Sequence, residues 1–201
     1  MDITGVVRPD GAAAEAARLV CAEYSSEALY NHAVRSFVFG AAYAQERSLD
    51  FDLELFYVAA LLHDFGLTTS FDSHALPFEE AGGHVVRVLT AGLGWSVERR
   101  DRAAEVIVLH MRHDVSTGED VESHLLQVGT SADVSGLRVA EFDPQFVADV
   151  LAEYPRLGFA AEFLALVTDQ ATRKPSSAAA ELVASGVAAR LASNPLERSS
   201  A

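Results

Sequence analysis

The sequence predicts an all-α protein, and three observations support this fold class. Ala, Leu and Glu dominate from residue 10 onward, proline is scarce, and apolar residues recur at intervals of three and four rather than two. The expected helices cover residues 11–23, 26–47, 51–64, 77–91, 96–113, 120–136, 143–153, 156–172 and 177–192.

Several expected helix ends have a local cause in the sequence. Asp50 is suited to cap the helix that begins at residue 51, and Gly66 is suited to end it. The stretch AGLG closes the fourth helix, and Pro144 fits the first turn of the seventh. The sequence contains no internal repeat.

Length and charge limit the classes of function. The 201 residues, half of them apolar and 22% charged, suffice for one soluble globular domain spanning residues 1–201. The formal net charge of −14 opposes contact with phosphates. We therefore expect no nucleic-acid partner and no binding to an anionic membrane surface.

The single cysteine, Cys21, excludes an intramolecular disulfide and a thiolate zinc cluster, so any metal must use histidine and carboxylate ligands. The first residues, MDITGVVRPDG, lack the basic and apolar segments of a secretion signal. No run of eighteen apolar residues occurs without a charge. These features predict a cytoplasmic enzyme or binding protein.

An ionisable pair, His63 and Asp64, ends the apolar stretch FYVAALLHDFG. On a helix, His63 shares a face with Phe56, Ala59 and Ala60, so its ring should turn into the interior. Burial of both groups costs free energy unless each is well partnered, and a divalent cation is one suitable partner. The alternative is a histidine that only hydrogen-bonds to Asp64 or to a carbonyl group.

Other ionisable residues lie in or at the ends of helices that have buried faces. His32 lies within ALYNHAVRSFVFG, His84 follows AGG, His110 ends VIVLH, and Asp133 lies within VGTSADVSG. Side chains from several helices that converge on one interior are what a metal site in a helical bundle requires.

The order His32, His63 with Asp64, His84, His110, Asp133 resembles the HD-domain superfamily of metal-dependent proteins, over about residues 25–140. The flanking motifs NHAVRSFVFG, ELFYVAALLHDFGLT and FEEAGG are most similar to its cyanamide hydratase branch. The resemblance implies a single HD domain with C-terminal helices over about 143–192. It also implies one divalent metal, Zn or Fe, with four ligands: His32, His63, Asp64 and Asp133.

The resemblance leaves two roles open for His84 and His110. Each is a candidate catalytic proton donor, or both are ligands of a second metal. Their alternatives are a surface position for His84 and a core histidine with its hydrogen bonds satisfied for His110. Arg35 is a candidate catalytic residue that orients a carboxylate ligand or binds an anionic group, and Asn31 is suited to similar supporting work.

The leading functional hypothesis is a metal-dependent hydratase that adds water to a small nitrile-like molecule. The alternatives are a two-iron HD-domain oxygenase, an HD-type nucleotide phosphohydrolase, and a catalytically silent binding domain. The phosphohydrolase is disfavoured because FGLTTSFD, which follows His63 and Asp64 directly, has no basic residue. Residues 67–78 either cover the pocket mouth or only connect helices, and the Ala-rich C-terminal helix is a candidate surface for a homo-oligomer.

Overall fold

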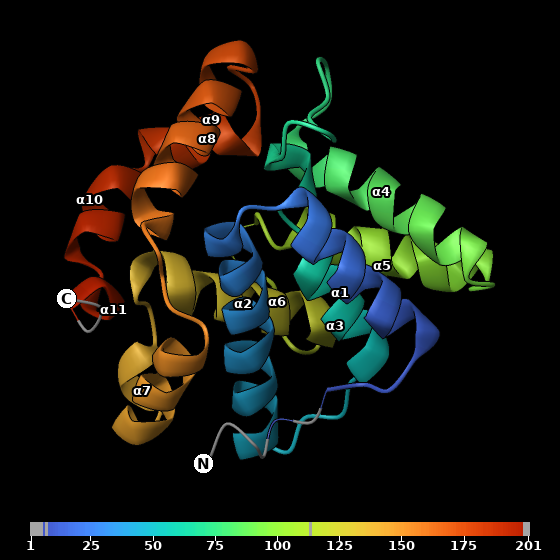
Figure 1. Ribbon diagram of the computed structural model, residues 1–201, viewed down its shortest axis with the longest axis horizontal. Helices are drawn as coiled ribbons and strands as arrows, with labels where there is room; N and C mark the ends of the chain where they lie inside the picture. Colours follow the sequence, from blue (N-terminus) through green and yellow to red (C-terminus); the bar gives the residue numbers. More distant parts are fainter. Residues whose placement is uncertain (1–5, 7, 113, 199–201) are drawn as a thin grey trace.

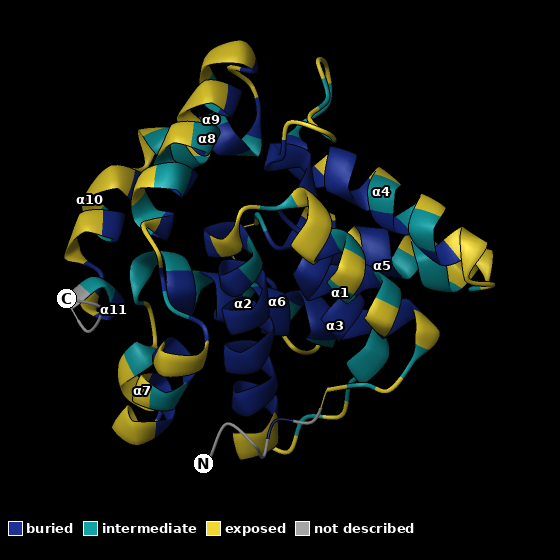
Figure 2. Ribbon diagram, viewed as in Figure 1, coloured by how far each residue is buried: buried dark blue, intermediate teal, exposed yellow. Residues whose placement is uncertain are grey.

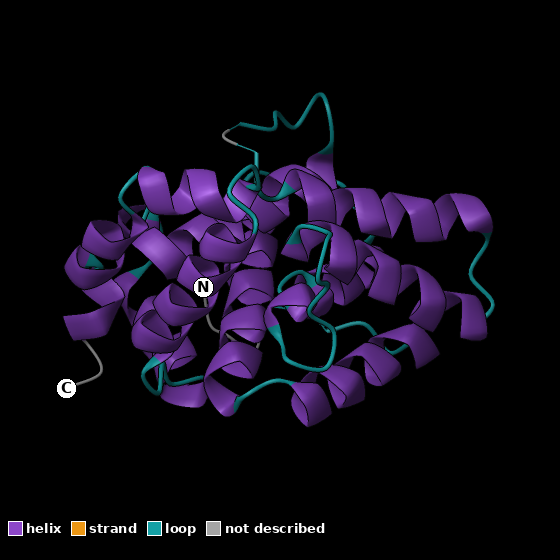
Figure 3. Ribbon diagram, turned by 90° about the horizontal axis from the view of Figure 1, so that it is seen from above, coloured by secondary structure: helices purple, strands orange, loops and turns teal. Residues whose placement is uncertain are grey.

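The computed structural model describes residue 6 and residues 8–112 and 114–198, and this part of the chain contains helices but no strand (Figures 1 and 3). The all-α prediction is therefore confirmed. In chain order the helices are α1 (Ala12–Tyr24), α2 (Glu27–Glu46), α3 (Leu53–Leu62), the 3₁₀ turn η2 (Phe65–Leu67), α4 (Phe78–Gly92), α5 (Val97–Leu109), α6 (Val121–Ser135), the 3₁₀ turn η3 (Val139–Glu141), α7 (Pro144–Glu153), α8 (Phe159–Arg173), α9 (Ala178–Ala184), α10 (Val187–Ser193) and α11 (Pro195–Arg198).

The helix expected at residues 177–192 is in fact two helices. They are separated at Gly186, whose φ of 86° is in the left-handed region that favours glycine. The sequence also misplaces a cap: the side chain of Asp52, not Asp50, accepts the hydrogen bond from the Leu55 amide at 3.0 Å. Pro144 occupies the first turn of α7, as expected.

Two helices end earlier than predicted, and both differences concern the site. Helix α3 ends at Leu62 and α5 at Leu109, so His63 and His110 are the C-cap residues of these helices. Each imidazole turns back along the last turn of its helix, and its Nδ1 contacts the carbonyl oxygen three residues earlier, that of Ala60 for His63 and that of Ile107 for His110. The two rings lie close together, with centroids 4.9 Å apart.

Helix α2 is the central element, and other helices surround it on several sides (Figure 1). It packs against α6 and α3, while the α4–α5 pair lies on one side of the molecule and α8, α9 and α10 lie on the other (Figure 1). Figure 2 shows α2 buried along nearly its whole length. Among the described residues, no helix combines the length and apolarity needed to cross a bilayer.

Helices α2 and α6 run antiparallel and approach closely because glycines lie at their contact. A Cβ added to Gly129 would lie 1.9 Å from the Ser36 carbonyl oxygen, and one added to Gly40 would lie 2.6 Å from the Leu125 carbonyl oxygen. The residues that meet along this contact are spaced four apart on each helix: Gly40 meets Leu125, Ser36 meets Gly129, and His32 meets Asp133. The glycines thus set the distance at which His32 meets Asp133.

This close contact predicts that Gly129→Ala destabilises the protein by about 2 kcal/mol or more, because the new methyl group would meet backbone rather than a flexible side chain. The free energy of unfolding in urea is the measurement. Gly92→Ala is the matched control, because the space around Gly92 is open and its helix favours alanine. Equal stability of the two variants would contradict the close packing of α2 against α6.

Candidate metal centre

His63 is held in place by the end of its own helix. Its Nδ1 lies 2.8 Å from the carbonyl oxygen of Ala60, and its side chain is almost fully buried. A carbonyl oxygen can only accept, so Nδ1 carries the hydrogen of this bond. In the neutral imidazole the Nε2 atom therefore has a free lone pair, which is directed away from the helix.

His32 is fixed from both its edge and its face. Its Nδ1 lies 2.6 Å from Oδ2 of Asp133, and its ring stacks on that of Phe159 with centroids 4.3 Å apart. Because a carboxylate accepts, Nδ1 of the neutral ring donates this hydrogen, and Nε2 again keeps a free lone pair. The chain thus orients both imidazoles so that their Nε2 atoms face each other.

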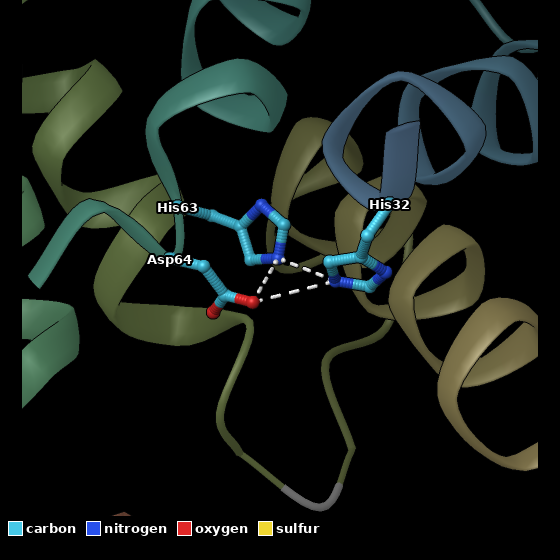
Figure 4. A group of neighbouring side chains, drawn as sticks. All are labelled: His32, His63 and Asp64. Atoms are coloured by element: carbon cyan, nitrogen blue, oxygen red, sulfur yellow. Dashed lines mark hydrogen bonds and ion pairs between the residues drawn. The ribbon is translucent and has the colours of Figure 1, made fainter. Parts of the chain in front are cut away.

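Three potential ligand atoms converge between α2 and the end of α3 (Figure 4). The Nε2 atoms of His32 and His63 are 3.2 Å apart, and Oδ2 of Asp64 lies 3.4 Å from the first and 3.3 Å from the second. Ligands bound to zinc at about 2.0 to 2.1 Å in a tetrahedron are separated by about 3.3 Å. The three separations match this value, so the atoms form one face of a zinc-sized tetrahedron.

The donor set fits a cation better than it fits a hydrogen-bond network. With both Nδ1 atoms used as donors and both rings in the neutral form that metal binding requires, two nitrogen lone pairs and a carboxylate oxygen point at one another. Oδ2 of Asp64 is buried and has no hydrogen-bond partner. Facing lone pairs in a buried site repel, whereas a divalent metal is attracted to all of them. His32, His63 and Asp64 are therefore the residues that can hold a metal.

Neighbouring charges keep the carboxylate of Asp64 ionised. Burial alone would raise the pKa of Asp64, but the neighbouring imidazoles of His63 and His32 hold it well below its usual range. Burial alone would likewise lower the pKa of His32, but Asp133 and Asp64 raise it overall. Asp64 is thus ionised at neutral pH, as a metal ligand must be.

The structure places Asp133, the fourth predicted ligand, at the Nδ1 edge of His32 and outside the group of three converging ligand atoms. Its Oδ1 accepts from Nε of Arg35 at 2.7 Å and from Nη1 of Arg156 at 2.9 Å. Its Oδ2 accepts from Nη2 of Arg35 at 2.8 Å and from His32. With both oxygens engaged by cationic or ring N–H donors, Asp133 orients His32 through its Nδ1 atom.

Arg35, three residues after His32 on α2, pairs with the carboxylate of Asp133. Its Nη1 also donates to the carbonyl oxygens of Tyr154 at 3.0 Å and Pro155 at 3.1 Å. Arg35 is fully buried and does not line the cavity beside the cluster. Asn31, also on α2, donates to the same Pro155 carbonyl oxygen at 2.9 Å. Arg35 therefore supports the site and has no contact with the space where a substrate would bind.

Arg156 is a supporting residue that the sequence did not reveal. It is almost fully buried, and its Nε lies 2.5 Å from Oε1 of Glu197. The guanidinium groups of Arg35 and Arg156 are thus balanced by the carboxylates of Asp133 and Glu197. In the sequence Arg156 follows a proline in the stretch EYPRLG, between two helices, where apolar periodicity gives no indication of burial.

His110 repeats the arrangement of His63 at the end of α5. Its Nδ1 contacts the carbonyl oxygen of Ile107, three residues earlier, and its ring centroid lies 4.9 Å from that of His63. Burial, together with the nearby charge of His63, lowers the pKa of His110 to about 4. His110 is therefore neutral at pH 7, with Nε2 free, and it borders the same cavity as the three ligand residues.

The other described histidines lie outside the cluster and do not line the cavity. His84 is exposed on α4 and does not line the cavity, so this placement does not support a role as ligand or proton donor. His74 is also exposed, and His124 directs Nδ1 to the Val115 carbonyl at 2.6 Å. His113 lies outside the described residues.

A cavity of about 410 Å³ opens beside the metal cluster. His32, His63, Asp64 and His110 form its inner end, and α6 and the C-terminal helices α9 and α10 form its outer part. Residues 67–78 do not line it. Their Asp72 instead accepts hydrogen bonds from Gln170 at 2.8 Å and from Arg173 at 2.7 Å, which ties this segment to α8.

Comparison with known proteins agrees with this site. The HD domain family matches residues 29–142, more than half of the chain and the part that holds the cluster. The chain belongs to the HD-domain family. The adjacent His63 and Asp64 of this HD-domain protein are the pair found at the centre of the metal cluster.

Two curated proteins of Saccharomyces cerevisiae are similar to this HD-domain protein: cyanamide hydratase DDI2 and cyanamide hydratase DDI3. Each is 30% identical to it over 172 residues, which cover 80% of this chain and 75% of the yeast protein. The similarity covers a larger share of the chain than the HD domain match over residues 29–142. The resemblance to the cyanamide hydratase branch inferred from motifs is therefore confirmed.

Proposed function

We propose that this HD-domain protein is a metal-dependent hydratase that adds water to the carbon–nitrogen triple bond of a cyanamide-type substrate. The observation that carries the proposal is the convergence of three lone-pair donors, 3.2 to 3.4 Å apart, at the inner end of a cavity. The activity named for the two yeast relatives supplies the reaction class.

One divalent metal per chain, Zn or Fe, would be held by His32, His63 and Asp64. Such a metal polarises a nitrile and makes a water molecule acidic enough to react near neutral pH. Three protein ligands leave room for water or substrate, as in catalytic rather than structural zinc sites. The two-histidine, one-carboxylate set is typical of metal sites that act on small molecules.

The chain's own residues supply orientation and proton transfer. Asp133, held by Arg35 and Arg156, fixes the tautomer and direction of His32. His110, neutral at pH 7, borders the cavity and acts as the group that takes a proton from water and returns it to the nitrile nitrogen. Both hydrogens of water finally reside on that nitrogen, so the reaction needs no oxidant or reductant.

The placements of the other polar residues disfavour the alternative chemistries. A two-metal oxygenase of this family type would use His84 as well as His110, and His84 is exposed away from the cluster. A nucleotide phosphohydrolase needs cations near the reacting phosphate. Arg35 and Arg156 are near the cluster, but both bond to Asp133 and neighbouring acceptors. Two other arginines line the cavity, and of these Arg112 pairs with Glu119 and Arg190 bonds to Ser185.

The test is hydration of cyanamide to urea by purified protein loaded separately with zinc or iron. We expect urea formation that depends on the metal, is lost after chelation and returns when metal is restored. Metal content by mass spectrometry should be about one per chain. Oxygen consumption in place of urea formation, or an occupancy of two metals per chain, would favour the oxygenase instead.

A further inference from the structure

The cavity beside the metal cluster is far larger than cyanamide. A volume of 410 Å³ is that of about 14 water molecules in the liquid, at about 30 Å³ each. Cyanamide consists of one carbon and two nitrogens with their hydrogens, so it occupies about the space of two or three waters. Most of the cavity would remain filled with water if cyanamide were the only substrate.

Beyond the metal cluster, apolar side chains from three helices line the cavity, and α6 adds the neutral polar residues Gln127, Thr130, Ser131 and Ser135. Val134 on α6, Phe163 on α8, and Ala178 and Leu182 on α9 line it. On α6, Thr130 and Val134 are four residues apart and so lie on one face of the helix. Ligand pockets of this size are characteristically apolar with a few polar groups that fix orientation.

Apart from Asp64 in the metal cluster, the charged side chains among the described lining residues lie toward the open side of this cavity. Arg112 and Glu181 are exposed, and Arg190 donates from Nη2 to the Ser185 hydroxyl at 2.9 Å. Among the described lining residues, the ionisable groups of the inner end belong to the metal cluster and His110. The cavity thus has the metal cluster and His110 at its inner end, charged groups toward its open side, and between them apolar side chains of α6, α8 and α9 beside neutral polar residues of α6.

We infer that the substrate is a substituted cyanamide whose apolar substituent, about the size of a phenyl or benzyl group, occupies the space between α6, α8 and α9. This inference rests on the proposed hydratase function and deepens it. The cyano group would lie at His32, His63 and Asp64, and the substituent would lie against Val134, Phe163 and Leu182. Water adds to the cyano carbon, both its hydrogens pass to the terminal nitrogen, and the product is the N-substituted urea.

The kinetic test compares cyanamide with N-benzylcyanamide on the metal-loaded full chain. We expect kcat/KM for N-benzylcyanamide to exceed that for cyanamide by about tenfold or more, because even one methylene in an apolar pocket changes discrimination by about tenfold. Equal or higher kcat/KM for cyanamide would overturn the inference and leave the hydratase function intact.

A substitution that fills the space proposed for the substituent provides an independent test. Ala178→Phe places a ring on the cavity wall, and Ala165→Phe makes the same change on an exposed position of α8 outside the cavity. We expect Ala178→Phe to lower kcat/KM for N-benzylcyanamide about tenfold while changing that for cyanamide less than about twofold. Ala165→Phe should leave both unchanged, and an equal loss with both substrates would count against the proposed position of the substituent.

Calorimetric binding of N-benzylurea, the product, tests the same space without turnover. The urea should bind the parent protein and Ala165→Phe, and its affinity for Ala178→Phe should fall about tenfold. This result supports the apolar subsite even if cyanamide and N-benzylcyanamide are both left unhydrated, in which case only the proposed reaction fails. Failure of N-benzylurea to bind the parent protein would overturn the inference.

Discussion

Asp64→Asn is expected to abolish metal binding and to lower kcat/KM by about 1,000-fold or more, because the metal supplies several kcal/mol of transition-state stabilisation. Oδ2 of Asp64 lies within 3.4 Å of both Nε2 atoms and is the only charged donor in the described three-residue cluster. The new amide can donate hydrogen bonds to the two imidazole nitrogens, so the fold should survive. Metal content by mass spectrometry and the unfolding midpoint are the two measurements.

His63→Ala should give the same loss of metal, since it removes one of the two nitrogen ligands. The matched control is His84→Ala, which makes the identical change at an exposed position and should retain metal and activity. A folded Asp64→Asn or His63→Ala protein that still holds about one metal per chain would show that the cluster is not the metal site. Loss of metal from His84→Ala would contradict the exposed placement of that residue.

The sequence predicted the helices and the central pair because both follow from periodicity. Apolar residues at intervals of three and four locate a helix, and the run before His63 shows that the pair lies in the interior. Periodicity does not identify the last residue of a helix, because apolar residues can continue beyond the point where the helix ends. For that reason His63 and His110 were assigned to helices, whereas both are C-cap residues.

The positions of His84 and Asp133 depend on which way a side chain points, and sequence order carries little of that information. His84 follows two buried glycines, but the buried residues of α4 lie on the opposite side, so its own side chain is exposed. Asp133 lies in the family's order of ligands, yet the register between α2 and α6 sets it against the Nδ1 edge of His32. That register is fixed by glycine contacts between helices about 90 residues apart in the chain, and a single sequence does not show such a pairing.

The difference between a ligand and a supporting carboxylate can be measured with Asp133→Asn, the same isosteric change as Asp64→Asn. Asp133 is fully buried and its oxygens accept from Arg35, Arg156 and His32. Removal of its charge leaves two buried guanidinium groups facing only Glu197 as a carboxylate partner. Breaking a buried ion pair by removing one partner costs about 3 to 5 kcal/mol. We therefore expect a loss of this size in the free energy of unfolding in urea.

Metal binding should respond differently, because none of the three ligand atoms is removed. Mutation of the residue that hydrogen-bonds to a metal-ligating histidine weakens metal affinity by about 10- to 100-fold. Asp133→Asn should therefore still bind about one metal per chain when metal is in excess. Competition against a chelator of known affinity measures the shift. The two variants thus have opposite profiles: Asp64→Asn folds without metal, whereas Asp133→Asn binds metal in a weakened fold. If folded Asp133→Asn fails to bind metal at any concentration, Asp133 is itself a ligand, and the arrangement in which it only orients His32 is wrong.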